Sequence, residues 1–457
     1  MKTYFARDAL LPRGWSRDVR ITVDERGAIA EVRERASAAG AETLAGPVLP
    51  GMANLHSHAF QRAMAGLTEV RGSFHDDFWS WRELMYRFVA RLTPGQAQAI
   101  ATHLYIEMLR HGYTAVAEFH YVHNDPAGRP YAERAEILLR HLAAAREAGI
   151  AVTLLPSLYR WSGFGARPLE PRQRRFAADA AAVLDMARAA RAAAAGDPDA
   201  VVGVAPHSLR AADPESLAAL VAGIRAEDPQ APIHIHAAEQ TKEVEDCLAW
   251  SGNRPVEWLL AHMPVDARWC IVHATHMTAA ETEALAKSGA AVGLCPSTEA
   301  NLGDGVFPLT EYRDAGGRWG IGGDSHVSRD PAEELRLLEY AQRLQHRRRN
   351  IVVTAAQPAV GTTLWLEAAA GGAQALGRAM GAIAPGRRAD LVVLDGDAPD
   401  LAGRSGDAIA NVLVFSGARA LVRDVMVGGR WVVRRGRHPR AEESAAAFRR
   451  ALAKLRG

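Results

Sequence analysis

Lysine and cysteine are scarce in this sequence of 457 residues. The three cysteines, Cys247, Cys270 and Cys295, are too few for a disulfide framework and too widely spaced for a CxxC metal knuckle. We expect them to be reduced and mostly buried thiols. Only four of the 54 basic residues are lysines, and none lies between Lys2 and Lys242. This absence excludes lysine chemistry from the first half of the chain.

The sequence also lacks an excess charge of either sign and a long hydrophobic run. Lys and Arg number 54 against 52 Asp and Glu, and no basic run is dense enough to neutralise a phosphate backbone. Nowhere do 18 uncharged apolar residues follow one another, and charged residues interrupt the N-terminal MKTYFARDALLPRGW. We therefore expect a cytoplasmic protein that binds neither nucleic acid nor a membrane.

An apolar fraction of 48% excludes disorder, and the length predicts one large domain with a smaller one. Eight short apolar runs alternate with helical stretches such as 96–110 and the alanine-rich 175–195, which is the pattern of repeated βα units. Eight such units predict an α/β fold, a (β/α)8 TIM barrel, whose usual size is about 250 residues. The runs are 48–55, 113–119, 150–158, 200–205, 231–237, 269–274, 290–294 and 318–322.

At both ends of the chain, short stretches of alternating apolar and polar residues replace the βα pattern. The stretches 20–23 and 28–32 flank the turn 24–27, as in a β-hairpin. Similar alternation returns in 389–394 and in 425–433, where a Gly-Gly pair separates two short strands. We expect the two termini to build one small β-domain together.

Polar residues cluster where the apolar runs end. The carboxyl ends of barrel strands form the face that carries catalysis, so residues far apart in the chain are expected to converge there. The exits read His56-Ser57-His58, Glu118-Phe119-His120-Tyr121, Pro156-Ser157-Leu158-Tyr159, Pro206-His207-Ser208-Leu209-Arg210, His236-Ala237-Ala238-Glu239, His273-Ala274-Thr275-His276, Pro296-Ser297-Thr298 and Gly323-Asp324-Ser325-His326.

Four of these exit residues predict a metal site. His56 and His58 are two apart, so both imidazoles point to the same side of their strand. Taken alone, this pair is equally typical of hydrogen-bonded histidines, but His236 ends the fifth run and Asp324 the eighth. Three imidazoles and one carboxylate suit one Zn²⁺ per subunit with a water completing the shell, although Fe²⁺, Co²⁺ and Ni²⁺ accept the same set. His234 competes with His236 as a ligand, but it lies one layer deeper and is interpreted as a packing or supporting residue.

In this order the motifs NLHSH, HAAE, the isolated His273 and GGDSH resemble the amidohydrolase superfamily. The resemblance implies a metal hydrolase on a (β/α)8 barrel with a small β-sandwich built from both termini, and 385–395 is similar to the superfamily's return into that domain. Many members bridge two metals with a carboxylated lysine after strand four, where this chain has Pro206-His207. A single-metal, deaminase-type site is therefore favoured. We expect residues 1–48 and 384–437 to form the β-sandwich domain and residues 49–383 to form the barrel. Residues 438–457 are expected to form a C-terminal helix.

A deaminase must also move a proton from its water to the departing nitrogen. A divalent ion lowers the pKa of that water towards neutrality and so supplies hydroxide for attack. Glu239, three residues beyond His236, is placed to act as the proton shuttle, unless it is a solvated carboxylate at the start of a helix. His273 is expected to assist together with Asp324, the alternative being a hydrogen-bonded barrel histidine.

A closer similarity covers most of the chain. Its motifs resemble the family of N-formimidoyl-L-glutamate deiminases, hydrolases of linear C–N bonds that act in histidine degradation and leave N-formyl-L-glutamate and ammonia. Such a substrate carries two carboxylates and an amidine, and arginine is the suitable cation for binding it. The motifs are NLHSHAFQRAMAGL, FWSWRELMYRF, AEFHYVHN, APHSLRA, HIHAAEQ, STEANLGDG and GGDSHVSRDPAEELR.

Matched motif by motif, this resemblance implies that five residues contact the substrate: Gln61, Arg82, Tyr121, His207 and Arg210. Arg82 could instead be a surface arginine stacked on a tryptophan. Gln61 and Tyr121 could instead be residues that form hydrogen bonds at strand ends. No role is assigned to Ser325, His326 or Arg329 beside Asp324.

Two other functions stay open. Another mononuclear deaminase, acting on guanine, adenosine or an s-triazine, binds a neutral aromatic ring and has less need of two arginines. A non-catalytic, metal-stabilised scaffold is disfavoured because the ligand set, Glu239 and His273 are all present. The expected partner is a small dicarboxylate amidine, and the family resemblance implies a homodimer.

Overall fold

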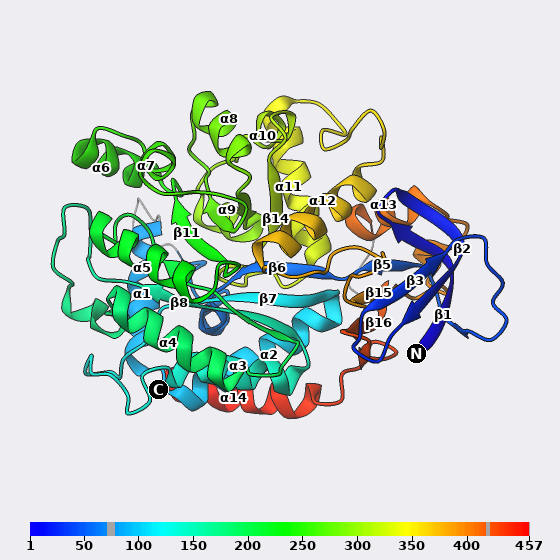
Figure 1. The fold of residues 1–457 in the computed structure, drawn as a ribbon, viewed down its shortest axis with the longest axis horizontal. Helices are drawn as coiled ribbons and strands as arrows, with labels where there is room; N and C mark the ends of the chain where they lie inside the picture. Colours follow the sequence, from blue (N-terminus) through cyan, green and yellow to red (C-terminus); the bar gives the residue numbers. More distant parts are fainter. Residues whose placement is uncertain (71–77, 417–420, 457) are drawn as a thin grey trace.

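Strands from both ends of the chain pair in one eight-stranded sheet that lies beside a larger barrel (Figure 1). The structure is a computed structural model that describes residues 1–70, 78–416 and 421–456. The sheet has the order β17-β16-β15-β5-β1-β2-β3, with β4 paired to β1, and encloses a small apolar core of its own. The predicted β-domain is thus confirmed. Its strands are β1 (Lys2–Leu11), β2 (Gly14–Val23), β3 (Ile29–Arg33), β4 (Glu42–Thr43), β5 (Val48–Pro50), β15 (Leu391–Leu394), β16 (Val422–Val427) and β17 (Arg430–Val433).

Parallel strands close into the barrel, so the predicted (β/α)8 class is confirmed. Two hydrogen-bonded sheets, β10-β8-β7-β6 with β9 on β8 and β11-β12-β13-β14, are joined by parallel bridges from Ser208 to His236 and from Ser57 to Asp324. The predicted fourth strand consists of two short pieces, β9 and β10. The barrel strands are β6 (Met52–Ser57), β7 (Tyr113–His120), β8 (Ala151–Leu158), β9 (Ala200–Val202), β10 (Ala205–Pro206), β11 (Ile233–Ala237), β12 (Trp269–His273), β13 (Ala291–Leu294) and β14 (Arg318–Ile321).

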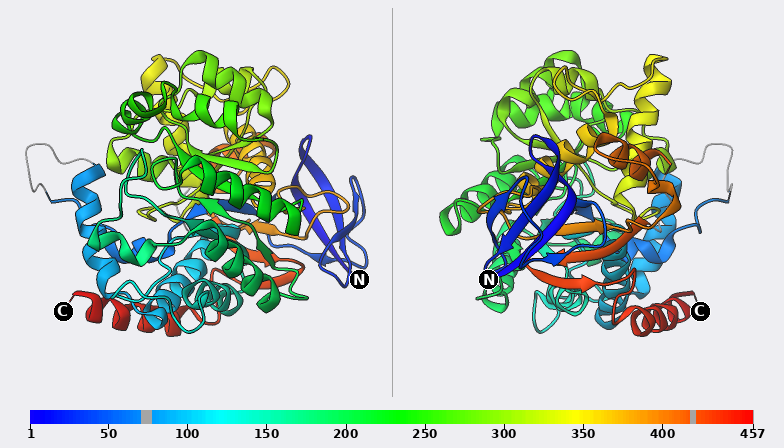
Figure 2. Two further views of the ribbon diagram at one scale, coloured as in Figure 1. Left: turned by 60° about the vertical axis from the view of Figure 1, so that its left-hand side comes forward. Right: turned by 90° about the vertical axis from the view of Figure 1, so that its right-hand side faces the viewer.

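Helices surround the barrel, and the last of them packs against α2 (Figures 1 and 2). The α-helices are α1 (Phe78–Arg91), α2 (Pro94–His111), α3 (Glu136–Ala148), α4 (Ala180–Ala193), α5 (Pro214–Glu227), α6 (Thr241–Ser251), α7 (Pro255–His262), α8 (Ala279–Ser288), α9 (Pro296–Leu302), α10 (Leu309–Asp314), α11 (Pro331–His346), α12 (Val360–Ala375), α13 (Asp407–Phe415) and α14 (Ala441–Arg456). Short 3-10 turns are η1 (Ala59–Met64), η2 (Pro171–Phe176) and η3 (Pro399–Leu401). No helix of the described residues is long and apolar enough to cross a membrane.

Three local features differ from the expectations. The run 48–55 is two strands, because Gly51 separates β5 in the terminal sheet from β6 in the barrel, and a Cβ there would lie 2.3 Å from the Thr114 hydroxyl. The alanine-rich helix begins at Ala180 rather than 175, since the Asp179 side chain caps it by accepting the Ala182 N–H. Helix α13, within 384–437, was not expected.

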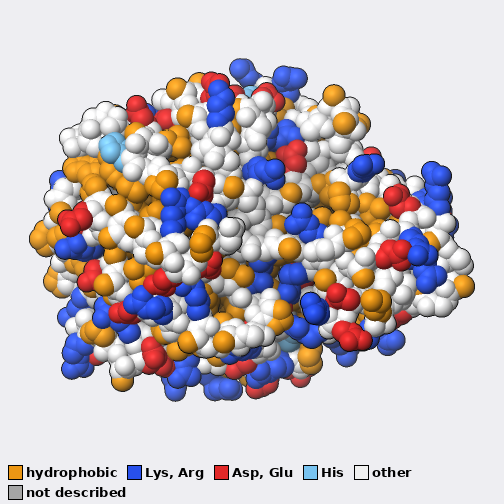
Figure 3. Space-filling view, viewed as in Figure 1, with side chains coloured by type: hydrophobic (Ala, Val, Ile, Leu, Met, Phe, Trp, Pro, Cys, Tyr) orange, Lys and Arg blue, Asp and Glu red, His pale blue; other side chains and the backbone are white. Residues whose placement is uncertain are grey.

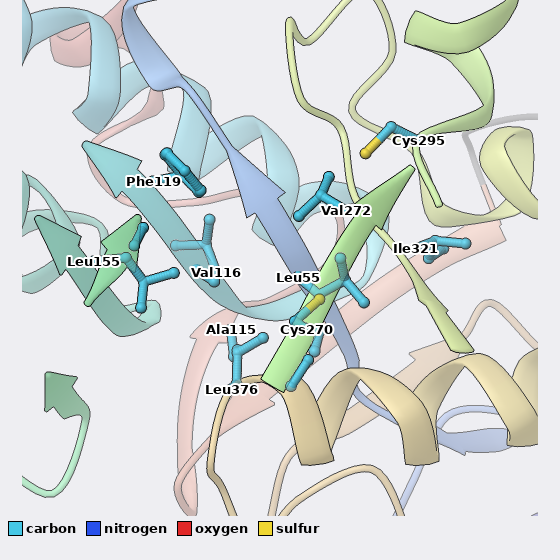
Figure 4. Close-up of a cluster of buried hydrophobic side chains, with 14 of the residues drawn as sticks. Leu55, Ala115, Val116, Phe119, Leu155, Cys270, Val272, Cys295, Ile321 and Leu376 are labelled. Carbon is cyan, nitrogen blue, oxygen red and sulfur yellow. The ribbon is translucent and has the colours of Figure 1, made fainter. Parts of the chain in front are cut away.

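The barrel interior is a packed apolar core that forms the floor of the site. Figure 4 shows Leu55, Val116 and Cys270 among the side chains gathered between the strands. The Leu55 side chain packs directly against Gly293 of β13 and Gly320 of β14. A Cβ atom at either glycine would lie 2.6 Å from a Leu55 methyl carbon, so neither position has room for a side chain. All three cysteines are free and buried, as expected. On the face that Figure 3 shows, basic and acidic side chains are interspersed.

Candidate metal centre and active site

Three buried histidines converge on one point at the carboxyl end of the barrel. His56 lies near the end of β6, His58 directly follows that strand, and His236 lies in β11. The Nε2 atom of His236 lies 3.1 Å from Nε2 of His56 and 3.4 Å from Nε2 of His58. Two nitrogens bound to one tetrahedral zinc ion, each at about 2.05 Å, are about 3.3 Å apart, so this spacing matches a shared metal ion.

Asp324 completes the set from the turn after β14. Its Oδ1 lies 3.7 Å from His56 Nε2 and 3.5 Å from His58 Nε2. The turn is tied to the histidine strand, because the backbone N–H groups of Gly323 and Asp324 donate to the His56 carbonyl oxygen. The structure therefore brings together the four residues that the sequence analysis selected as metal ligands.

Backbone hydrogen bonds orient the imidazoles. The Nδ1 atoms of His58 and His236 donate to the carbonyl oxygens of Phe119, at 2.8 Å, and His207, at 2.9 Å, which leaves each Nε2 lone pair free for a metal ion. His234, in contrast, places its Nε2 2.8 Å from the carbonyl oxygen of Ala375, away from the cluster. This contact accords with a packing role for His234.

Charge and burial suit a cation. Burial lowers the pKa of His58 to about 3 and those of His56 and His236 well below the ordinary value, so all three imidazoles are neutral, the form that binds a metal. Burial raises the pKa of Asp324 to about 7. A cation beside this carboxylate opposes the rise and favours its charged form. The donor set thus fits a divalent metal ion.

The backbone adopts unusual conformations around the cluster. Five non-glycine residues at barrel exits have positive φ angles: Ala238 (53°), His273 (68°), Ala274 (50°), Asp324 (49°) and His326 (59°). Each such conformation typically costs about 1–3 kcal/mol and persists only where the surrounding structure holds it. Two of the five, His273 and Asp324, line the pocket, so part of this conformational cost is paid at the site itself.

His273 and Glu239 lie next to Asp324. The Nε2 atom of His273 is 3.7 Å from Asp324 Oδ2 and 3.9 Å from Glu239 Oε1. Burial lowers the pKa of His273, but Glu239, Glu299 and Asp324 outweigh it and raise that pKa to about 10. Glu239 is buried at 4% exposure rather than solvated, which removes the alternative of a surface carboxylate at the start of α6.

A pocket opens over this cluster. All five predicted substrate-binding residues line the pocket: Gln61, Arg82, Tyr121, His207 and Arg210. His58, His236, Glu239, His273 and Asp324 line it as well. Aromatic side chains form much of the remaining wall: Phe78, Trp81, Tyr159 and Phe176.

Hydrogen bonds and charges fix several of the wall residues. The Arg82 guanidinium donates to the Tyr159 hydroxyl at 2.9 Å and lies 5.4 Å from the centroid of the Tyr86 ring. The Gln61 amide donates to the Tyr121 hydroxyl at 2.8 Å. Burial raises the pKa of Glu243, and the charge of Arg210 opposes this rise. The contacts with Tyr159 and Tyr86 thus fix the Arg82 guanidinium at the pocket, and Arg210 lines the same pocket.

Besides the apolar wall, four polar residues that line or support the pocket were given no role by the sequence analysis: Tyr159, Thr298, Glu299 and Glu118. All lie at or just after a strand end, and the exit motifs already contained three of them, so their position was a usable signal. Of the unassigned residues, Ser325 contacts the Thr298 hydroxyl at 2.9 Å, His326 contacts Ser57, and Arg329 lies 3.8 Å from Glu107.

Glu118, on β7, supports the candidate metal site through hydrogen bonds to residues next to His56 and His58. Its carboxylate accepts hydrogen bonds from the Ser57 hydroxyl at 2.6 Å, the Tyr105 hydroxyl at 2.8 Å and the Ala59 N–H at 2.9 Å. Because the Ser57 hydroxyl donates to Glu118, it accepts from His326 Nε2 at 2.8 Å. This network joins the strand end between His56 and His58 to the turn after Asp324.

We predict that Glu118→Ala lowers the free energy of unfolding by about 3 kcal/mol or more, since it leaves several buried donors without an acceptor. Urea unfolding of the metal-free protein, followed by circular dichroism, measures the change. The control is Glu283→Ala on the exposed side of α8, for which a change within about 0.5 kcal/mol is expected. A loss below 1 kcal/mol for Glu118→Ala would contradict this prediction.

Comparison with known proteins agrees with this geometry. The sequence profile of the amidohydrolase family matches residues 48–432, and the chain belongs to this family. The profile described as "Formimidoylglutamate deiminase HutF, N-terminal domain" matches residues 1–46. The matched segments thus cover both the barrel and the terminal strands.

Individual relatives span the full chain. A formimidoylglutamate deiminase from Pseudomonas aeruginosa is 57% identical over 457 residues, covering 100% of both chains. The crystal structure of an amidohydrolase from Brucella melitensis superposes with a TM-score of 0.94 at 47% identity, again covering both chains completely. An adenosine deaminase from Xanthomonas campestris with bound zinc, at 21% identity and a TM-score of 0.80 over 99% of this chain and 98% of that one, shares the fold.

Proposed function

We propose that this protein hydrolyses N-formimidoyl-L-glutamate to N-formyl-L-glutamate and ammonia, a step of histidine degradation. The observation that carries the proposal is the 57% identity, over the full length of both chains, with a formimidoylglutamate deiminase. The pocket chemistry supports it, because a metal-ligand set, a buried carboxylate and two arginines line one cavity. A dicarboxylate amidine requires all three.

The proposed metal ion is zinc, one per subunit, held by His56, His58, His236 and Asp324. Three neutral imidazoles and a carboxylate are ligands typical of a catalytic zinc site. When bound, the ion lowers the pKa of water and so supplies the nucleophile for attack on the formimidoyl carbon.

Glu239 is the proposed proton shuttle. Its carboxylate takes a proton from the attacking water and delivers it to the terminal nitrogen of the amidine. The new bond joins the water oxygen to the formimidoyl carbon, and the bond from that carbon to the terminal nitrogen breaks as ammonia leaves. The proton left on the attacking oxygen then reaches the same nitrogen through Asp324, so both protons of the water leave with ammonia. His273, whose pKa its carboxylate neighbours raise, donates a hydrogen bond beside the tetrahedral centre.

Arg82 and Arg210 are proposed to bind the two substrate carboxylates. A guanidinium binds a carboxylate through two parallel N–H bonds, which fixes orientation as well as charge. The Gln61 side-chain oxygen is buried without a hydrogen-bond partner among the described residues, and it suits an amidine N–H group. Tyr121 and His207 are proposed to contact the substrate between these groups.

A turnover assay tests the reaction. We expect the metal-loaded protein to convert N-formimidoyl-L-glutamate to equal amounts of ammonia and N-formyl-L-glutamate. The proton's destination decides the products, since protonation of the substituted nitrogen would release formamide and glutamate instead. Formation of formamide, or no ammonia at all, would contradict the proposal.

Inhibition distinguishes the substrate class. Dicarboxylates such as glutamate analogues are expected to compete with the substrate because they occupy both arginines, and purines are not. Inhibition by purines alone would favour a deaminase of aromatic rings. The homodimer implied by the resemblance and the cytoplasmic location expected from the sequence stay predictions, and sedimentation velocity of the purified protein tests the first.

A further inference from the structure

Glu299 is a buried carboxylate beside His273 to which the proposed mechanism gives no task. It lies in α9, is 7% exposed, and places its Oε1 3.1 Å from His273 Nδ1. An ionised carboxylate can only accept hydrogen bonds, so the proton between these atoms belongs to Nδ1. His273 consequently turns its Nε2 towards Asp324 and Glu239.

We infer that Glu299 is a positioning residue that fixes the orientation of the His273 imidazole during the proposed reaction. The expected effect of Glu299 on kcat rests on the proposed function, whereas its effect on the orientation of the His273 ring does not. A partner of this kind matters because an imidazole that rotated about its side-chain torsions would no longer direct its Nε2 at Asp324 and Glu239.

The backbone at His273 makes such a partner necessary. His273 and Ala274 both have left-handed φ angles where β12 ends. The strained turn is held by the Ala274 N–H, which donates to the carbonyl oxygens of Ala237 at 3.0 Å and Val272 at 3.1 Å. These bonds fix the main chain but leave the ring free to rotate about its side-chain torsions. The bond to Glu299 removes this freedom.

Glu299 is itself fixed in place. The same Oε1 accepts the Cys295 N–H at 2.8 Å, at the residue that precedes α9. The N–H of Glu299 donates to the Cys295 carbonyl oxygen at 2.9 Å, so residues 295 and 299 are joined twice. A carboxylate held in this way can orient a histidine without reorganising during turnover.

Another buried glutamate offers a matched control. Glu334, on α11, holds the start of α9 by accepting from the Ser297 N–H at 2.8 Å and its hydroxyl at 2.6 Å. Like Glu299 it is buried and supports α9, but its two carboxylate oxygens bond to Ser297 rather than to His273. The Glu334→Ala variant therefore measures how much kcat changes when α9 loses a supporting contact but His273 keeps its bond to Glu299.

The kinetic test compares three variants of the metal-loaded protein with N-formimidoyl-L-glutamate as substrate. Glu299→Ala is expected to lower kcat by about 10–100-fold, with KM within about twofold, as for other residues that orient catalytic-site histidines. Glu299→Gln keeps an oxygen acceptor, so its kcat should exceed that of Glu299→Ala by about tenfold. Glu334→Ala should retain most of the wild-type kcat. An equal loss in Glu334→Ala, or no recovery in Glu299→Gln, would overturn the inference.

A spectroscopic test needs no turnover. The proton on an imidazole nitrogen bonded to a carboxylate gives a low-field resonance in proton NMR spectra. We expect one such resonance in the wild type that is lost in both Glu299→Ala and His273→Gln and kept in Glu334→Ala. Its persistence in Glu299→Ala, or its absence from the wild type, would refute the positioning role. A wild-type protein that releases no ammonia but shows this pattern would refute the proposed function alone.

Discussion

Glu239→Gln is expected to keep its metal ion and lose at least two decades of kcat. The amide matches the carboxylate in shape but cannot take a proton from water, and removal of a general acid–base group typically costs 10²–10⁴-fold. Because Glu239 is not one of the four residues proposed to hold the metal ion, metal content measured by atomic emission should equal that of the wild type. Steady-state ammonia release gives kcat.

The matched control is Glu245→Gln on α6, the helix that follows Glu239, where the side chain is exposed and does not line the pocket. Its kcat should be close to that of the wild type. Near-normal turnover by Glu239→Gln would remove Glu239 from the mechanism, whereas loss of metal from that variant would show that it acts as a ligand.

Replacing His236 and His234 one at a time should separate metal binding from packing. His236→Ala removes one of the converging nitrogens, so we expect metal affinity to fall by more than the 10–100-fold that loss of a ligand's supporting partner costs. His234→Ala should keep the metal ion. It should instead lower the free energy of unfolding by about 1–3 kcal/mol, because the Ala375 carbonyl oxygen loses its buried partner.

Competition with a chromogenic chelator measures the affinity, and chemical unfolding of the metal-free proteins measures the stability. The two variants control for each other, since each removes a buried imidazole from β11. If only His236→Ala retained the metal, the ligand assignment would be reversed.

The candidate ligands could be found from the sequence because they depend on local rules. Side-chain alternation places His56 and His58 on one side of a strand, and the parallel barrel brings the ends of its strands to one face. These two rules are enough to bring together His236 and Asp324 without any distance information. The same rules separated His236 from His234 by depth in the barrel, and the His234 contact with Ala375 agrees.

Other features depend on contacts between distant residues, which periodicity does not reveal. Glu299 belonged to a quoted motif, but nothing in the motif shows that its carboxylate reaches His273 across two strand ends. Likewise, the change of sheet at Gly51 follows from close contact with Thr114, sixty residues later in the chain. Local sequence favours a continuous strand there, and tertiary packing overrides it.

The position of β5 between β1 and β15 ties completion of the terminal sheet to the end of protein synthesis. Val48 pairs with Val393, so this neighbour emerges from the ribosome only after most of the chain has been translated. At about 5–20 residues per second, the N-terminal strands wait roughly 20–70 s with one edge unpaired. An open strand edge can recruit other chains. The nascent protein is therefore most exposed to mispairing on polysomes, before its last strands arrive.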